Sequence, residues 1–393
     1  MKTTIKNIRE IGLLSTVLLF SAFVWFSCNK ENTEKGYTVE KLREIYSDEP
    51  SNWPAPNVDA DIDWKEIAPV PPSPYKGVDS LQPLIELGKV LFFDPRLSSS
   101  GQISCSSCHD PQLSWSNGRT VGVGHDHQLG QRNTPSLFYS WATTPLFWDG
   151  RAGTLEQQAL EPVANPLEMH QGLHLLPAKI EKIKGYQPYF EKAFGDEVVT
   201  VDRIASALAY FQRTLEGRES KLDKFLKGDK EALSDDALKG LHLFRTKARC
   251  INCHNGPFLT DNKFHNLGLH YYGRKYEDLG RYLVTKDTAD VGRFKTPTLR
   301  EVMRTGPWMH NGLFPSMDGI MNMYDHGMAR PKPRPEFEDD PLFPKTSDIL
   351  KPLGLTPQEK KELIAFLESM TTHIYRMPRP EMPSAEGNNV AQQ

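Results

Sequence analysis

The chain has 393 residues with 47 basic and 50 acidic side chains, which give a formal charge of −3, and 38% of its residues are hydrophobic. At about 150 residues per domain, this length predicts two or more cores in a globular protein. A near-neutral balance without a block of Lys and Arg argues against nucleic-acid binding, which needs a concentrated positive face. Five cysteines are too few for a disulfide scaffold, so their spacing carries the information.

The N-terminus has the pattern of an export signal. Positive charges precede an uncharged stretch over residues 11–27, which predicts a signal peptide over residues 1–27. Cys28 follows a small residue at the end of that stretch and resembles the lipidated first residue of a bacterial lipoprotein, although Trp25 replaces the usual Leu. A plain signal with an incidental cysteine and an uncleaved anchor are the alternatives. We expect a periplasmic protein that contacts a membrane only through a lipid anchor.

The next segment, residues 28–80, is predicted to be a tether. Proline removes backbone donors and favours extended chain, and the second half of this segment is rich in it, with Pro54, Pro56, Pro69, Pro71, Pro72 and Pro74. Folding is therefore expected to begin near Leu81.

The other four cysteines form two Cys-x-x-Cys-His motifs that lie 145 residues apart, Cys105-Ser-Ser-Cys108-His109 and Cys250-Ile-Asn-Cys253-His254. Each motif suits covalent haem attachment, because two thiols can form thioethers with the vinyl groups while the adjacent imidazole reaches the iron. A zinc ribbon also uses paired Cys-x-x-Cys but gives no reason for a His after both pairs. A redox dithiol has the same difficulty. The motifs predict two c-type haems.

An internal repeat surrounds these motifs. The spacing from Pro135 to Pro145 to Gly150 is ten and five residues, and the same spacing recurs in Pro297, Pro307 and Gly312. This repeat predicts two c-type cytochrome domains related by duplication, over residues 81–230 and 231–375, followed by a flexible tail over 376–393.

The pattern between the landmarks is helical. Apolar residues recur at three- and four-residue steps from Thr200 to Leu215, and Thr356 with Glu359 forms a capping-box signature ahead of another apolar run. Alternation typical of strands is scarce. We expect a mostly α fold with long loops, one of them the Pro-rich stretch of residues 328–344.

The chain resembles the bacterial di-haem cytochrome c peroxidase family, which includes the di-haem enzymes that mature methylamine dehydrogenase. The resemblance covers nearly all of residues 81–372 and rests on both haem motifs, residues 91–98, Phe147-Trp148-Asp149-Gly150-Arg151, Glu168-Met169 and the C-terminal helix. In that family the N-terminal haem is the peroxide site, and the C-terminal haem accepts electrons from an outside donor.

The resemblance also assigns roles around the first haem. Glu168 matches the distal carboxylate that moves a proton between the peroxide oxygens, and Gln158 matches a distal amide that orients peroxide. His125 corresponds to a movable sixth ligand in a glycine-containing loop, with His127 as a nearby competitor. Trp148 matches the tryptophan between the two haems, and the repeat places it at the register of His310.

Two further sites are implied by the resemblance. Asn133, Thr305 and Pro307 match the positions that supply oxygen ligands to an interdomain calcium ion, a hard cation that accepts neutral oxygens. At the second haem, where the peroxidases usually use a methionine sulfur, an ungapped count from Gly312 places Tyr324. A tyrosine oxygen would lower the ferric potential relative to a thioether. A small shift would restore sulfur ligation by one of Met321, Met323 and Met328.

The predicted function is reduction of hydrogen peroxide to water with electrons from a small cytochrome c or cupredoxin. Tyr324 favours one alternative, a peroxide-dependent oxidase of a protein or small molecule that stores oxidising equivalents as high-valent iron on both haems. The other alternative is an electron-transfer cytochrome with both irons closed, which would need no distal Glu168. Dimers are common in the family, so a homodimer is a further expectation from the resemblance.

Overall fold

The computed structural model describes residues 37–373 and 376–386. The chain divides into two units between Lys41 and Leu42. Helix α2 (Val39–Tyr46) spans the point of division, and every other helix and strand of the described residues belongs to the second unit. The predicted signal peptide and Cys28 lie outside the described residues. Across the part of the chain that the structure describes, no helix is long and apolar enough to cross a bilayer.

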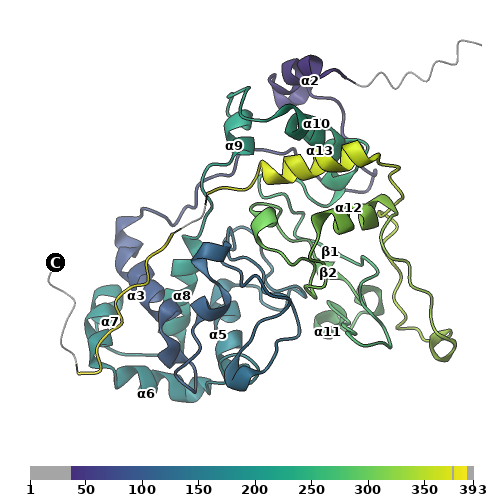
Figure 1. Cartoon of the computed structure of the whole chain (residues 1–393). Helices are drawn as coiled ribbons and strands as arrows, with labels where there is room; N and C mark the ends of the chain where they lie inside the picture. The colour runs from purple at the N-terminus through teal and green to yellow at the C-terminus, as the bar shows by residue number, and fades with distance from the viewer. Residues whose placement is uncertain (1–36, 374–375, 387–393) are drawn as a thin grey trace, which may run out of the picture. The chain divides into compact units, whose positions relative to one another are not determined.

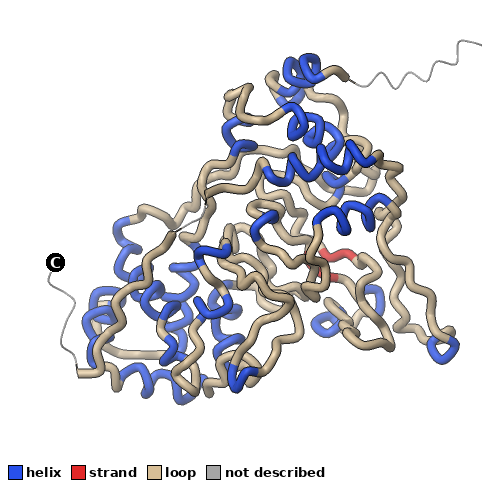
Figure 2. The backbone as a smooth tube through the Cα atoms, viewed as in Figure 1, coloured by secondary structure: helices blue, strands red, loops and turns tan. Residues whose placement is uncertain are grey.

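The second unit is rich in helix and has little sheet (Figures 1 and 2). Its one two-stranded sheet among the described residues pairs β1 (Phe264–His265) antiparallel with β2 (Phe294–Lys295). The first half contains α3 (Gln82–Phe93), α4 (Cys105–Cys108), α5 (Leu155–Ala164), α6 (Leu176–Glu181), α7 (Gln187–Phe194) and α8 (Val201–Arg213). The second half contains α9 (Lys221–Leu226), α10 (Asp235–Arg245), α11 (Tyr282–Thr285), α12 (Met317–Asp325) and α13 (Pro357–Glu368).

Two of the predicted helices are confirmed together with the signals that start them. Thr200 caps α8 by accepting a hydrogen bond from the backbone N–H of Arg203. Thr356 and Glu359 form the predicted capping box of α13. The Pro-rich stretch contains a single short 3₁₀ turn, Pro335–Phe337.

Each half is built around one close helix pair. In the first half α3 packs on α8, and a Cβ added to Gly88 would lie 1.9 Å from the carbonyl oxygen of Ala207. In the second half α10 packs on α13, and a Cβ added to Gly240 would lie 2.0 Å from the carbonyl oxygen of Glu362. The absence of a side chain at these two glycines lets the helix backbones touch and leaves the other faces of the helices for the two large hydrophobic clusters.

Gly240→Ala should lower the free energy of unfolding by about 1–3 kcal/mol, because the new methyl group would overlap the backbone of α13. Gly319→Ala is the matched control in α12, where the nearest atom to an added Cβ is 3.8 Å away. That control should stabilise the helix by about 0.5–1 kcal/mol. Urea unfolding of both haem-loaded variants tests the packing, and equal stabilities would contradict it.

The segment predicted to be a tether is packed from residue 42 onward. Tyr46, Trp53 and Ile67 are buried in the hydrophobic cluster of the second half. Arg245 of α10 is 1% exposed, lies over the rings of Tyr46 and Trp53, and pairs with Glu66 at 2.5 Å. The prolines thus shape an extended segment, and its interspersed aromatic and aliphatic side chains fasten it to the second half.

The described part of the predicted tail also contacts the body of the protein. Met377 and Met382 pack against the hydrophobic cluster of the first half, and the backbone N–H of Gly185 donates to the carbonyl of Ser384 at 3.0 Å. The chain therefore returns to the first half after α13.

Candidate functional site

The first Cys-x-x-Cys-His motif is held by local hydrogen bonds. Ser104 and Ser107 form a capping box around α4, so the two thiols lie one turn apart. His109 follows the helix, and its Nδ1 donates to the carbonyl of Trp115 at 2.9 Å. Burial lowers the pKa of His109 to about 4. The imidazole is therefore neutral, which is the form that binds iron.

The second motif has the same arrangement. Cys250 begins a 3₁₀ turn and Cys253 directly follows it, and Nδ1 of His254 donates to the carbonyl of Leu259 at 3.1 Å. Burial again lowers the pKa of this histidine. None of the four motif cysteines is in a disulfide. The donor set at both motifs fits a covalently attached haem.

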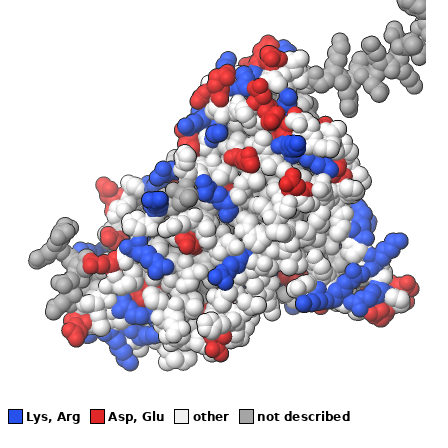
Figure 3. All heavy atoms as spheres, viewed as in Figure 1, with Lys and Arg blue, Asp and Glu red and all other residues white. Residues whose placement is uncertain are grey.

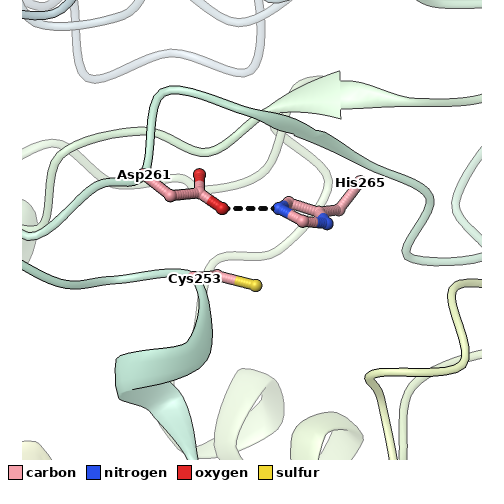
Figure 4. A group of neighbouring side chains, drawn as sticks. All are labelled: Cys253, Asp261 and His265. Atoms are coloured by element: carbon pink, nitrogen blue, oxygen red, sulfur yellow. Dashed lines mark hydrogen bonds and ion pairs between the residues drawn. The ribbon is translucent and has the colours of Figure 1, made fainter. Parts of the chain in front are cut away.

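The four cysteines do not gather into a zinc site. Among the described residues, the one group with metal-ligand spacing is Cys253, Asp261 and His265, whose ligand atoms lie within 4.8 Å of one another (Figure 4). His265 Nε2 and Asp261 are 2.7 Å apart. Burial opposes the ionisation of Asp261, but the contacts with His265 outweigh it and hold the pKa of this carboxyl below its ordinary value. A thioether at Cys253 would leave this pair beside the second haem.

Both motifs open into one cavity of about 910 Å³ that is lined mainly by apolar side chains. Six other sequence-predicted residues line it: Asn133, Trp148, Gln158, Glu168, Thr305 and Tyr324. Two predicted residues, His125 and Pro307, are outside its lining. The folded chain thus brings most of the predicted site residues into the lining of one cavity.

Glu168 lies on the first-motif side of this cavity. Its Oε1 accepts a hydrogen bond from Asn165 Nδ2 at 2.8 Å, and its charge acts on the thiols of Cys105 and Cys108. Burial raises the pKa of Glu168, an effect that the Asn165 hydrogen bond opposes only in part. The other lining carboxylate, Asp149, is ion-paired with Arg132 and Arg151. Glu168 is therefore the lining carboxylate suited to exchange a proton.

His125 is tied to Glu168 through the backbone. Its N–H donates to the carbonyl of Glu168 at 2.7 Å, while its ring contacts His170 and lies 3.4 Å from Ser99 Oγ. The next two residues, Asp126 and His127, have positive φ angles of 53° and 58°. In this conformation the His125 ring does not line the cavity.

Trp148 lines the cavity and contacts residues of both halves of the chain. Its indole Nε1 donates to the carbonyl of Asn133 at 2.9 Å, and its ring meets His310 edge to face with centroids 6.4 Å apart. His310 is stacked on Phe294 at 3.5 Å. An aromatic column therefore connects the first half of the chain to the second.

Tyr324 faces the second motif from α12. The pKa of its hydroxyl is raised by burial and by the neighbouring thiols of Cys253 and Cys250. Of the candidate methionines, Met321 also lines the cavity, whereas Met323 lines a separate pocket and Met328 is buried elsewhere. Tyr324 and Met321 thus both share the cavity with the second motif.

Sequence reasoning missed Lys295, a basic residue that lines the cavity. Lys295 of β2 donates to the carbonyl of Thr143, and its backbone N–H donates to the carbonyl of Trp148 at 2.8 Å. Burial lowers the pKa of Lys295 to about 7. A lone lysine in a two-residue strand gives no sequence signal, because its burial depends on segments about 150 residues away.

Comparison with known proteins identifies the family. Residues 82–231 match the sequence profile described as di-haem cytochrome c peroxidase. The methylamine utilization protein MauG of Methylorubrum extorquens is 38% identical over 315 residues, which are 79% of this chain and 84% of that protein. The cytochrome c551 peroxidase of Nitrosomonas europaea is 36% identical over 311 residues, with 79% and 86% covered.

A solved structure agrees in fold. The crystal structure of a MauG-like protein associated with microbial copper homeostasis has a TM-score of 0.68 and 29% identity, and the match covers 82% of this chain and 98% of the other. With two Cys-x-x-Cys-His motifs on one cavity and relatives matched over most of their length, the chain belongs to the di-haem cytochrome c peroxidase family and is an oxidoreductase that takes two c-type haems.

Proposed function

We propose that the protein reduces hydrogen peroxide to two waters with two electrons and two protons. Its donor would be a small periplasmic redox protein, a cytochrome c or a cupredoxin, that delivers electrons on the His254 side. Peroxide would react on the His109 side. When bound, the haems supply the one-electron redox chemistry and a position for peroxide. The observation that carries the proposal is the half-buried Glu168, which lines the cavity beside the first motif.

Glu168 would take a proton from one peroxide oxygen and give it to the other. A carboxyl whose pKa is raised toward neutrality does both more readily than a solvated one. Asn165 holds its Oε1 in place. Gln158, one helix turn before Pro162 on α5, would donate an amide hydrogen bond that orients peroxide. The apolar lining would keep bulk water from competing.

His125 is proposed as a ligand that closes the first site at rest and leaves on activation. Its backbone bond to Glu168 couples the two residues, and Asp126 and His127 have positive φ angles, a strained conformation that is common in switch regions. Trp148 is proposed to carry electrons between the halves, because its ring lies against His310 and its carbonyl against β2.

A second candidate function is favoured by Tyr324. A tyrosine oxygen at the second haem would stabilise oxidised iron, which suits a peroxide-dependent oxidase of a protein or small molecule. One relative of this chain carries the name methylamine utilization protein MauG. The structure is consistent with this candidate in that Tyr324 and the second motif share the cavity.

A calcium ion between the halves is also proposed. Asn133 directs its amide N–H groups to the carbonyls of Arg119 and Thr120, so its Oδ1 points the other way. Its backbone N–H binds the carbonyl of His310 in the other half. Thr305 and Pro307 would supply further oxygens.

Chelation of the calcium ion should lower peroxide turnover, and added calcium should restore it. Unchanged turnover after verified calcium removal would contradict the site.

Three proposals concern the organisation of the chain. The similar helix pairs and histidine hydrogen bonds of the two halves support an internal duplication. The N-terminal pattern supports export and lipidation at Cys28. A homodimer stays a prediction from the family.

Steady-state kinetics test the proposed reaction. The haem-loaded protein should oxidise a reduced small c-type cytochrome only when peroxide is present, with saturation in both substrates. An electron carrier would exchange electrons with the cytochrome but would not turn over peroxide, and that result would reject the proposal.

A further inference from the structure

A second cavity of about 420 Å³ lies in the second half. Its walls are the loop of residues 268–274, the Pro-rich loop of residues 329–343, and the side chains of Phe314 and Met323. Leu269 alone among the lining residues also lines the haem cavity. This pocket, which we call the loop pocket, is therefore separate from the haem cavity.

The loop pocket is lined by cations. Arg274, Arg330, Lys332 and Arg334 line it, and no carboxylate does. Figure 3 shows Lys and Arg gathered where the Pro-rich loop projects. Arg334 pairs with Glu336 at 3.3 Å, but within the described residues Arg274 and Lys332 have no ion pair. Exposed cations are usually only solvated, so the charge by itself does not define a site.

A buried donor distinguishes this pocket. His270 lines it and is 1% exposed, and its Nδ1 accepts a hydrogen bond from the backbone N–H of Tyr272 at 3.1 Å. The proton of the neutral ring is therefore on Nε2, which has no partner. A buried N–H without an acceptor is costly, so a ligand or water that brings an acceptor atom to Nε2 would be stabilised there.

The walls are aromatic and already in place. Phe343 meets the rings of His270 and Tyr272 edge to face, with centroids 6.0 and 5.7 Å apart. The Tyr272 hydroxyl donates to Asp340 at 2.6 Å, which fastens the Pro-rich loop to the other wall. Gly268, at φ +74°, lets the two loops touch, because an added Cβ would lie 1.9 Å from the carbonyl oxygen of Ala329. The pocket is thus preformed.

We propose that the loop pocket binds a small organic anion, a carboxylate with an aromatic or apolar body. The body would lie against Phe343 and Tyr271, an acceptor atom would take the hydrogen bond of His270 Nε2, and the charge would be met by Arg274 and Lys332.

Calorimetric titration of the haem-loaded protein tests this assignment with benzoate, benzamide and inorganic phosphate as probes. Benzoate should bind with saturation. Benzamide, which keeps the ring but has no charge, and phosphate, which has no apolar body, should each bind at least about ten-fold more weakly. If benzamide bound as tightly as benzoate, the pocket would recognise only the apolar body. If phosphate bound as tightly as benzoate, the pocket would recognise only the charge. Either result would overturn the proposal.

Variants locate the binding. Lys332→Gln should weaken benzoate binding about ten-fold, whereas Lys345→Gln, an exposed lysine of the same region outside the pocket, should leave it unchanged. His270→Gln is a second variant. If His270→Gln does not fold, Lys332→Gln still tests the proposal. No benzoate binding, or equal effects of the two lysine variants, would overturn the assignment. The readout is binding alone, so it is independent of peroxide turnover.

Discussion

Glu168→Gln should lower kcat for peroxide reduction by about 10²–10⁴-fold, the usual contribution of a positioned acid-base group. The amide keeps the size of the side chain and can still accept the hydrogen bond from Asn165, but it cannot carry a proton between the peroxide oxygens. Steady-state oxidation of a reduced small cytochrome by peroxide measures the effect. An unchanged kcat would reject the role of Glu168.

The control is Glu191→Gln, an exposed glutamate on α7, which should leave kcat unchanged.

The pH dependence of stability gives a second test of Glu168. Burial raises the pKa of Glu168 in the folded protein, so the unfolded chain loses this proton at lower pH than the folded one. Between these two pKa values the folded state holds more protons, and wild-type stability falls as pH rises. Glu168→Gln should remove that slope and be the more stable protein at neutral pH.

Tyr324→Met should raise the reduction potential of the second haem by a substantial part of the about 0.8 V range that axial ligands cover. A thioether stabilises reduced iron, whereas a tyrosine oxygen stabilises oxidised iron. Tyr324 lines the cavity beside Cys250 and Cys253, so a change of its oxygen should alter this haem selectively. Potentiometric titration followed by absorption resolves the two haems. Tyr324→Phe should change the spectrum of one of them.

Two methionine variants decide between oxygen and sulfur at this haem. Met321→Leu removes the sulfur that lines the same cavity, and Met323→Leu removes one that lines the loop pocket. Neither should shift the potential. If Tyr324→Phe left the spectrum unchanged while Met321→Leu altered it, sulfur would be the ligand.

The sequence predicted the features that depend only on residues close together in the chain. The spacing of Cys105, Cys108 and His109 is set by covalent chemistry, and the structure adds the backbone carbonyl that orients the imidazole. The starts of α8 and α13 could be predicted from Thr200 and Thr356, because capping needs only residues within one turn. Glu168, which the sequence matches to a family motif, lines the cavity that both haem motifs share, and its catalytic role stays a prediction.

Contacts between distant segments could not be predicted in the same way. The proline content of residues 50–77 indicates extended chain, but it does not reveal that Trp53 and Glu66 meet Arg245, more than 170 residues later. The burial of Lys295 and the unpartnered nitrogen of His270 also depend on loops brought together only in the folded chain.

Binding of cyanide to the haem-loaded protein, after its second haem has been reduced, tests the central claim that one of the two irons is open beside Glu168. The account predicts saturation at about one equivalent of cyanide per chain, with a spectral change confined to the haem at His109. Binding at both haems or at neither, or a change confined to the haem at His254, would contradict it.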